Sequence, residues 1–436
     1  MRDRQGTHGG APGNPPAAGT VDLTGGVGYS IRMENTYFRR GLGLKKEIEP
    51  VLAAEYHSNL VEDIRARGYV AQFGDVTLRL AKDFGFCYGV DRAVDYAYQA
   101  TFKFPDRRIF LLGEIIHNPH VNARLRQAGV TFLYPEAASG EFDFTVLQAD
   151  DVVILPAFGV TLADFQRLRE IGCVLIDTTC GSVLNVWKRV ESYARDGFTA
   201  LIHGKYFHEE TRATASQVNT AAGGKYIVVR DMDEARLVLD YIEQRPDALT
   251  RDAFLAHFAQ KASAGFDPDT DLVRIGVANQ TTMLATESLA IAAAAGRSLA
   301  VRHGEAHLAS HFRSFDTICS ATQERQDAVI QLMQDPPDVM VVIGGYNSSN
   351  TNHLAHLCRE YTTAYHIADA TCIEPATGII RHKPELAADA SEVATGRWLP
   401  EGPITIGLTA GASTPNIKIG ETIERILATR GIPLVG

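Results

Sequence analysis

The chain has 436 residues, of which 45% are hydrophobic and 22% are charged, and its formal net charge is −10. This length suits two to four globular domains, and the acidic balance argues against nucleic acid or an anionic membrane as a partner. No segment approaches the ~20 consecutive apolar residues of a membrane-spanning helix. Six scattered cysteines favour a reducing compartment. We expect the cytoplasm rather than a plastid, because residues 1–32 lack a secretory or serine-rich transit pattern.

Residues 1–32 are rich in glycine, proline and alanine, and we predict that they are disordered. Beyond them, short apolar runs alternate with segments of helical periodicity, a pattern typical of parallel α/β layers. The predicted helices are 50–67, 88–100, 121–127, 183–196 and 324–334. The predicted strands are 75–80, 108–112, 151–155, 174–176, 199–202, 227–229, 273–277, 339–343 and 404–408.

One sequence pattern occurs three times: a cysteine, a helical stretch, an apolar strand and then a polar loop. The three copies begin at Cys87, Cys180 and Cys319. In each copy the polar loop follows its cysteine after 28 to 30 residues, at His117, His208 and Ser348. A fixed period indicates a repeated supersecondary module. Because ligands gather at the carboxyl ends of parallel strands, we expect the loops and cysteines to meet in one shared pocket.

The repeat predicts an α/β fold of three pseudo-symmetric modules behind an N-terminal extension. We place the extension at 1–72 and the modules at 88–180, 181–315 and 316–436, with the strand 73–87 completing the third module. The inserted stretch 376–400 receives no role from the sequence.

Three thiolates from separate modules indicate either a zinc site with an added ligand or an iron–sulfur cluster with one open iron. Structural zinc sites usually draw their ligands from close pairs, whereas these cysteines lie 93 and 139 residues apart. A cubane cluster is larger and can bridge three modules, and an iron without a protein thiolate can act as a Lewis acid. The other cysteines stand outside the repeat and are assigned to packing: Cys173, Cys358 and Cys372.

The polar loops carry hydrogen-bond donors that suit a phosphate group. These candidates are His117, His208, Gln280, Thr281, Thr282, Ser348, Ser349, Asn350 and Ser413. Glu210 is the carboxylate candidate for proton transfer beside the thiols. Each motif taken alone also fits a packed histidine, an Asx-rich turn or a solvated helix start. His117 and His208 share equivalent positions in the repeat, which favours a ligand-binding role for these two residues.

Together these motifs resemble the 4-hydroxy-3-methylbut-2-enyl diphosphate reductases, which catalyse the last step of the methylerythritol phosphate isoprenoid pathway. The resemblance covers roughly residues 73–430 and includes motifs in all three modules. The matching stretches are Gly85–Val90, His117–Asn118, Asp177–Cys180, His208–Glu210, Gln280–Thr282, Thr317–Thr322, Asn347–Asn350 and Thr409–Ser413.

The resemblance implies a trefoil of three α/β domains around one [4Fe-4S] cluster per chain, whose open iron binds the substrate's C4 hydroxyl group. That hydroxyl would leave as water with two electrons and two protons, giving isopentenyl and dimethylallyl diphosphate. The implied cluster ligands are Cys87, Cys180 and Cys319. The implied partners are the small diphosphate substrate and an electron donor of the ferredoxin or flavodoxin type, with a homodimer as the assembly to test.

The resemblance also implies roles for the polar residues. It assigns the diphosphate to His117, His208, Ser348, Ser349, Asn350 and Ser413. Glu210 would be the proton source, and Thr281, with its neighbour Thr282, would orient the hydroxyl group.

One position departs from the pattern of many bacterial members, which carry an Ala-His-Gly sequence in the second loop. This chain has Ala157-Phe158-Gly159 there. Phe158 cannot donate a hydrogen bond to a phosphate, but the same form is similar to the longer plant and cyanobacterial branch, so we interpret it as a branch marker.

Two other functions stay open at this point. One is a redox-neutral hydro-lyase that uses the same kind of three-cysteine cluster, and it would differ from the reductase by needing no electron donor. The other is a non-catalytic, zinc-stabilised binding protein, which would be colourless.

Overall fold

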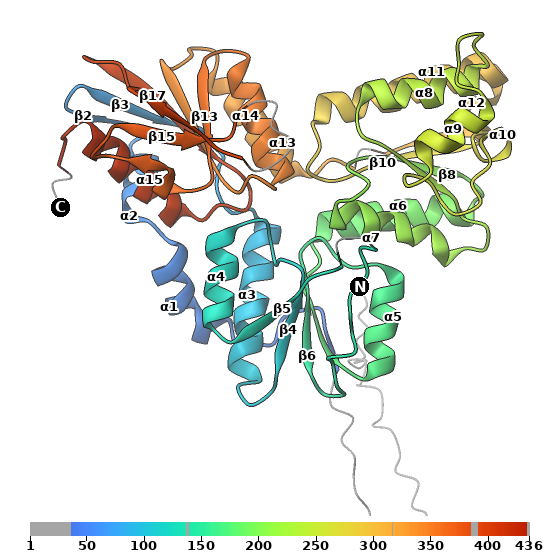
Figure 1. Ribbon diagram of the computed structural model, residues 1–436, viewed down its shortest axis with the longest axis horizontal. Helices are drawn as coiled ribbons and strands as arrows, with labels where there is room; N and C mark the ends of the chain where they lie inside the picture. The colour runs from blue at the N-terminus through green and yellow to red at the C-terminus, as the bar shows by residue number, and fades with distance from the viewer. Residues whose placement is uncertain (1–35, 137–138, 316, 385–390, 434–436) are drawn as a thin grey trace, which may run out of the picture. The chain divides into compact units, whose positions relative to one another are not determined.

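The computed structural model describes residues 36–136, 139–315, 317–384 and 391–433, which belong to one compact unit, Thr36–Gly436. The predicted disorder of residues 1–32 lies outside the described residues. In the described part of the chain, three sheets of mainly parallel strands are accompanied by one small antiparallel sheet (Figure 1). None of the helices in these residues is both long and apolar enough to cross a membrane.

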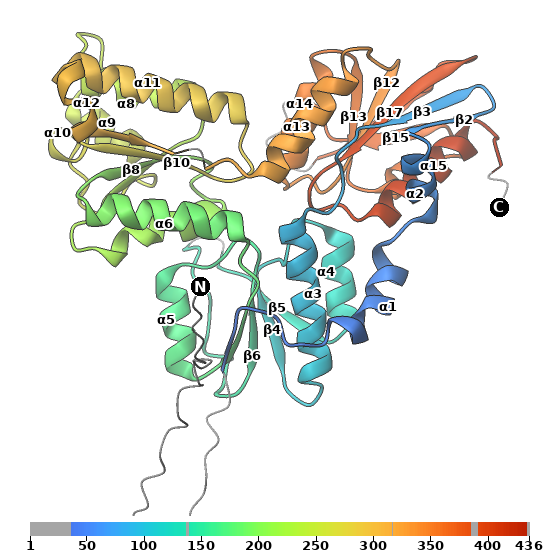
Figure 2. The same ribbon diagram turned by 180° about the vertical axis from the view of Figure 1, so that it is seen from behind.

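The first sheet has the strand order β1-β7-β6-β4-β5, and all neighbouring strands are parallel. Its strands are β1 (Tyr37–Phe38), β4 (Ile109–Leu112), β5 (Val130–Leu133), β6 (Val152–Leu155) and β7 (Val174–Asp177). Its helices are α1 (Lys45–Tyr56), α3 (Tyr88–Lys103), α4 (Pro119–Gln127) and α5 (Leu162–Ile171). Helices α3 and α4 lie on one side of the sheet and α5 lies on the other (Figures 1 and 2). Because β1 pairs with β7, part of the predicted N-terminal extension belongs to this sheet.

The second sheet has the order β11-β10-β8-β9, again with parallel neighbours. Its strands are β8 (Thr199–His203), β9 (Tyr226–Val229), β10 (Ile275–Asn279) and β11 (Phe312–Ser314). On one side lie α6 (Gly181–Arg195), α7 (Glu209–Ser216) and the 3-10 turn η1 (Gln217–Thr220). The helices α8 (Met232–Glu243), α9 (Arg251–Phe258) and α11 (Ala285–His303) cover the other side. The short helix α10 (Pro268–Asp271) lies between α9 and β10, and η2 (Glu305–His307) and α12 (Leu308–His311) lie between α11 and β11.

The third sheet has the order β13-β12-β17-β3-β2, and only β2 is antiparallel. Its strands are β2 (Val70–Phe73), β3 (Val76–Leu80), β12 (Val339–Ile343), β13 (Thr363–Ile367) and β17 (Ile404–Ala410). Its helices are α2 (Asn59–Ala66), α13 (Ser320–Leu332), α14 (Ser349–Arg359) and α15 (Asn416–Thr429), with the turn η3 (Ala370–Cys372).

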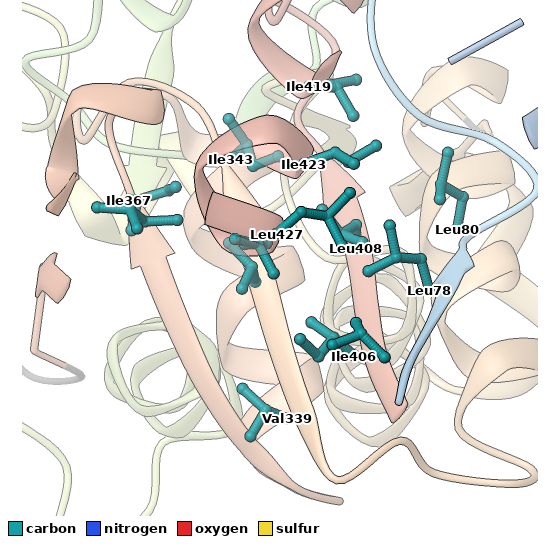
Figure 3. Packing of buried hydrophobic residues seen from close by; sticks show 14 of the residues in the cluster. Leu78, Leu80, Val339, Ile343, Ile367, Ile406, Leu408, Ile419, Ile423 and Leu427 are labelled. Carbon is teal, nitrogen blue, oxygen red and sulfur yellow. The ribbon is translucent and has the colours of Figure 1, made fainter. Parts of the chain in front are cut away.

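Strand β12 shows why this sheet is buried on both faces. Val339 and Ile343 pack with Leu408 and Ile423 in the core under α15 (Figure 3), whereas the alternate residue Met340 packs under α13 and α14. Successive side chains of a strand point to opposite faces, so a continuous apolar run fits a sheet covered on both sides.

The three sheets repeat one strand order. Reading from the strand that leads to a cysteine, the orders are β7-β6-β4-β5, β11-β10-β8-β9 and β3-β17-β12-β13. In each sheet the strand that follows the cysteine helix is third in this order. The predicted class, three pseudo-symmetric α/β modules, is therefore confirmed. In the third sheet β3 is the strand that leads to a cysteine, as β7 and β11 are in the first and second sheets.

Two expectations need correction. The predicted helix 50–67 is two helices, α1 and α2, because the Ser58 hydroxyl accepts the Val61 N–H and caps a new helix. The stretch 376–400 contains most of the antiparallel sheet, whose strands are β14 (Ile373–Glu374), β15 (Ile379–His382) and β16 (Val393–Gly396). The short strands β1, β2, β5 and β13 were not predicted, because each contributes only two to five residues between turns.

Candidate active site

The three repeated cysteines converge, as the sequence predicted. Cys87, Cys180 and Cys319 each immediately precede a helix, α3, α6 and α13 respectively, and all three line the same cavity. A helix N-terminus carries partial positive charge and unpaired N–H groups. These groups favour thiolates, although burial is the larger effect and raises the pKa of Cys87 and of Cys180.

Gly89 is what allows two of the thiols to approach. A Cβ atom at this position would lie 2.5 Å from Cys180 Sγ and 3.9 Å from Cys87 Sγ. The third thiol joins through Ser182, whose hydroxyl donates to Cys319 Sγ at 3.4 Å. Any side chain at position 89 would occupy the space in which the sulfurs meet.

The other three cysteines are buried in hydrophobic cores and do not line this cavity, which confirms their assignment to packing. None of the six forms a disulfide. Cys173 packs under α5, Cys358 under α13 and α14, and Cys372 beside α15.

A hydrogen-bonded chain joins the first and second polar loops. Glu210 N donates to His208 Nδ1 at 3.1 Å, the Nε2 atoms of His208 and His117 lie 3.2 Å apart, and His117 Nδ1 lies 2.9 Å from a Glu114 carboxylate oxygen. Because His208 Nδ1 accepts, its proton is on Nε2 and donates to His117 Nε2. His117 then carries its own proton on Nδ1, which donates to Glu114.

The same chain argues against a metal ion at the two histidines. His117, His208 and Glu209 offer ligand atoms within 4.8 Å of one another. A metal ligand must present a nitrogen lone pair, yet the Nδ1 lone pair of His208 already accepts the Glu210 N–H and its Nε2 carries the proton. Burial also holds the pKa of His208 well below its usual value, so this ring is neutral.

Phe158 packs against both imidazole rings from within the cavity. Its ring stacks on His117 with a centroid distance of 4.4 Å and meets His208 edge-on at 5.5 Å. The phenyl ring therefore fixes the planes of the two imidazole rings. It adds no hydrogen-bond donor of its own to the cavity.

Glu210 is the buried acid of the site, with 1% of its surface exposed. Burial raises its pKa to about 7, although the Thr281 N–H donates to Oε1 at 2.6 Å and opposes the shift. Desolvation disfavours the carboxylate. A substantial fraction of Glu210 is therefore protonated near neutral pH.

The third loop also lines the cavity. Ser348 caps α14 by accepting the Thr351 N–H at 3.3 Å, and Asn350 Oδ1 accepts the Ala412 N–H at 2.9 Å. Asn350 Nδ2 is buried and has no hydrogen-bond partner among the described residues. An unsatisfied buried donor is costly, and here it lines a cavity in which a ligand can accept its hydrogen.

Twelve of the site residues predicted from the sequence line this one cavity. They are Cys87, His117, Cys180, His208, Glu210, Thr281, Thr282, Cys319, Ser348, Ser349, Asn350 and Ser413. The repeat thus predicted their convergence; the contacts that hold them had to come from the structure.

Gln280, which the sequence suggested as a donor in the pocket, does not line the cavity and instead holds its neighbours in place. Its Oε1 accepts from Lys205 N and Thr211 Oγ1, and its Nε2 donates to Ser349 Oγ at 3.3 Å. Gln280 therefore links the second module to the third loop from behind the cavity.

The antiparallel sheet supports the third loop from outside the cavity. Lys383, directly after β15, donates to Tyr346 O at 3.3 Å and to Asn352 Oδ1 at 3.2 Å. Asn352 Nδ2 in turn donates to Tyr346 O and Ser348 O, both at 2.8 Å. Before β16, Glu392 accepts from the Tyr346 hydroxyl at 2.8 Å. This sheet therefore fixes the backbone that presents Ser348.

Comparisons with known proteins agree with this geometry. The model of the LytB protein family matches residues 78–427. The chain is 48% identical over 407 residues to the 4-hydroxy-3-methylbut-2-enyl diphosphate reductase of Thermosynechococcus vestitus, covering 93% of this chain and 98% of the relative. It is 49% identical over 399 residues to the enzyme of that name from Gloeobacter violaceus, covering 91% and 93%.

A solved structure shares the fold. The E-1-hydroxy-2-methyl-but-2-enyl-4-diphosphate reductase from Plasmodium falciparum aligns with a TM-score of 0.57 and 19% identity, covering 80% of this chain and 87% of that chain. At this identity the likeness concerns the fold alone.

Proposed function

The chain belongs to the LytB protein family, and from this premise we propose that it is a 4-hydroxy-3-methylbut-2-enyl diphosphate reductase, the last enzyme of the methylerythritol phosphate pathway. The reaction removes the C4 hydroxyl group as water, consumes two electrons and two protons, and yields isopentenyl and dimethylallyl diphosphate. The observation that carries the proposal is the single cavity in which three thiols, two histidines and one buried carboxyl group meet.

We propose that Cys87, Cys180 and Cys319 hold one [4Fe-4S] cluster. The donor set fits: three partly buried thiols lie at three helix N-termini, and Gly89 leaves space beside Cys87 and Cys180. No fourth cysteine of the described chain lines the cavity, which matches a cluster with one iron open to a ligand. When bound, such a cluster delivers electrons and offers a Lewis-acidic iron to a hydroxyl oxygen.

The polar loops would bind the diphosphate. Asn350 Nδ2 is an unpaired donor, and Ser349, Ser413 and the N-terminus of α14 add hydroxyl and backbone donors at the same place. From the first and second loops His117 and His208 supply imidazole nitrogens, with His208 Nε2–H free to turn from its neighbour to a phosphate oxygen.

Glu210 would supply the proton. Its Oε1 accepts the Thr281 N–H, which holds the carboxyl group in the wall of the cavity. The hydroxyl group leaves as water once it has received a proton, and a general acid with a pKa near the working pH is suited to this transfer. Thr281 and Thr282 would orient the hydroxyl group beside Glu210.

The three modules in this proposal are 88–180, 181–315 and 316–436, completed by 73–87. The recurring strand order supports this division. The two electrons come from an external donor, which we propose is a protein of the ferredoxin or flavodoxin type, because the cluster accepts electrons one at a time.

The test is anaerobic turnover of the hydroxylated diphosphate with a one-electron donor, followed by identification of the products. We expect both isomeric diphosphates and no turnover without reductant. Conversion without reductant would instead identify a hydro-lyase, and a colourless protein containing zinc would exclude both enzymes.

A further inference from the structure

Glu114 lies behind the histidine pair and outside the cavity. It follows β4 in the first loop, and its carboxylate oxygen Oε2 is 2.9 Å from His117 Nδ1. The side chain is 28% exposed and does not line the cavity, whereas His117 is buried and does. Any influence of Glu114 on a bound ligand must therefore pass through His117.

The hydrogen-bonded chain leaves His117 unable to donate to an anion. Its proton is on Nδ1 and points to Glu114, and its Nε2 accepts from His208. A phosphate oxygen that approached Nε2 would meet a lone pair. His117 becomes a donor there either by moving its proton from Nδ1 to Nε2 or by gaining a second proton.

Glu114 decides between these two routes. Moving the proton would leave the Nδ1 lone pair facing a carboxylate oxygen at 2.9 Å, which is repulsive. Gaining a proton keeps the Nδ1–H bond to Glu114, makes that bond charge-assisted and places a cationic Nε2–H against the phosphate. The second route lets His117 donate to the Glu114 carboxylate and to the phosphate at the same time.

The other charged or titratable groups near His117 do not supply a charge-assisted hydrogen bond to a protonated ring. His208 is buried, and its pKa is held low, so it stays neutral. Glu209 Oε2 is 3.8 Å from both His117 Nε2 and His208 Nδ1, too far for a hydrogen bond, and is 43% exposed. Glu210 is partly protonated near pH 7, and Lys205, which acts on His208, is a cation that opposes a second positive charge.

We propose that Glu114 is a positioning residue that makes His117 take up one proton when the diphosphate binds. The inference rests on the proposed function, because it assumes a diphosphate ligand at His117. It assigns different roles to two histidines at equivalent positions of the repeat. His117 becomes positively charged when the diphosphate binds, whereas His208 donates a hydrogen bond to the diphosphate as a neutral ring.

The test measures binding of inorganic diphosphate to the anaerobically purified full-length protein by calorimetry at pH 8, in two buffers of different ionisation enthalpy. The wild type should take up about one proton per site. Glu114→Gln should lose most of this uptake and bind on the order of 10-fold more weakly, as expected for a lost charge-assisted bond. Glu209→Gln is the matched control and should keep both the uptake and the affinity.

A double-mutant cycle separates positioning from general damage. In a His117→Gln background, Glu114→Gln should have no further effect on affinity, and the visible spectrum of each variant should match the wild type. Equal proton uptake in wild type and Glu114→Gln, or an unchanged effect of Glu114→Gln without His117, would overturn the inference. Failure of the wild type to bind diphosphate at all would instead count against the proposed function.

Discussion

Two sets of residues line the cavity, one from the first and second loops and one from the third loop, and we call these sets its two sides. The two sides differ in chemistry. The first and second loops contribute two imidazole rings and the titratable carboxyl group of Glu210, whose pKa is raised to about 7, whereas the third loop contributes neutral donors such as Ser349 and Asn350. A titratable side can deliver protons, but its binding strength changes with pH. A neutral side binds an anion equally well at every pH. The cavity thus separates proton delivery from pH-independent anchoring.

The two sides are also held in different ways. The histidines are fixed by side chains: Glu114 at Nδ1, Phe158 against both ring faces and edges. The third loop is fixed through its backbone carbonyls, which accept from Asn352 and Lys383. We therefore expect substitutions behind the first side to change pH dependence and substitutions behind the second to change affinity alone.

The largest effect should come from Gly89→Ala. This substitution disturbs the three thiols, on which turnover depends whichever set of loops binds the substrate. The new methyl group would lie 2.5 Å from Cys180 Sγ and force that thiol out of the site. We expect loss of most of the iron and of nearly all turnover, measured by iron analysis and anaerobic assay. Gly181→Ala is the matched control, because a Cβ there meets nothing within 4 Å. Full iron content in Gly89→Ala would contradict the arrangement of the thiols.

Glu210→Gln should abolish proton delivery and leave anchoring in place. We expect kcat to fall on the order of 10²-fold or more, with KM little changed. In the wild type only the protonated acid can donate, so kcat should decrease as pH rises through about 7, the pKa of Glu210. Glu209→Gln, an exposed neighbour, should retain the wild-type profile. If Glu210→Gln kept the same pH profile, Glu210 could not be the donor.

Asn350→Ala should weaken binding of the diphosphate and leave proton delivery unchanged. The amide loses one donor to the diphosphate, so KM should rise roughly 10- to 100-fold. Because the lost group does not titrate, the ratio of variant to wild-type KM should be constant from pH 6 to 8, in contrast to Glu114→Gln. A ratio that changed steeply with pH would show that the two sides are not independent.

The smallest effect should come from Lys383→Met, which loosens the third loop from outside. Its ammonium group donates to Tyr346 O and Asn352 Oδ1, and losing these bonds should raise KM about 2- to 10-fold with kcat retained. Lys46→Met, at an exposed position of α1, is the control. A fall in kcat with unchanged KM would contradict a role in positioning the loop.

The sequence predicted the convergence of the site because identical modules place identical loops at the same ends of their strands. It did not predict Glu114 or Lys383. These residues act through single side-chain contacts to partners at irregular sequence distances, and such contacts leave no periodic signal. The division of the helix 50–67 was missed for a related reason: one serine cap outweighed a continuous helical pattern.

The most direct test of the whole account is the iron and sulfide content of the anaerobically purified protein and of its Cys180→Ser variant, with Cys173→Ser as the control from the core. The account predicts about four irons per wild-type chain and a brown colour, a loss of most iron in Cys180→Ser, and wild-type content in Cys173→Ser. Wild-type iron and colour in Cys180→Ser would contradict the claim that the three modules jointly hold one metal centre.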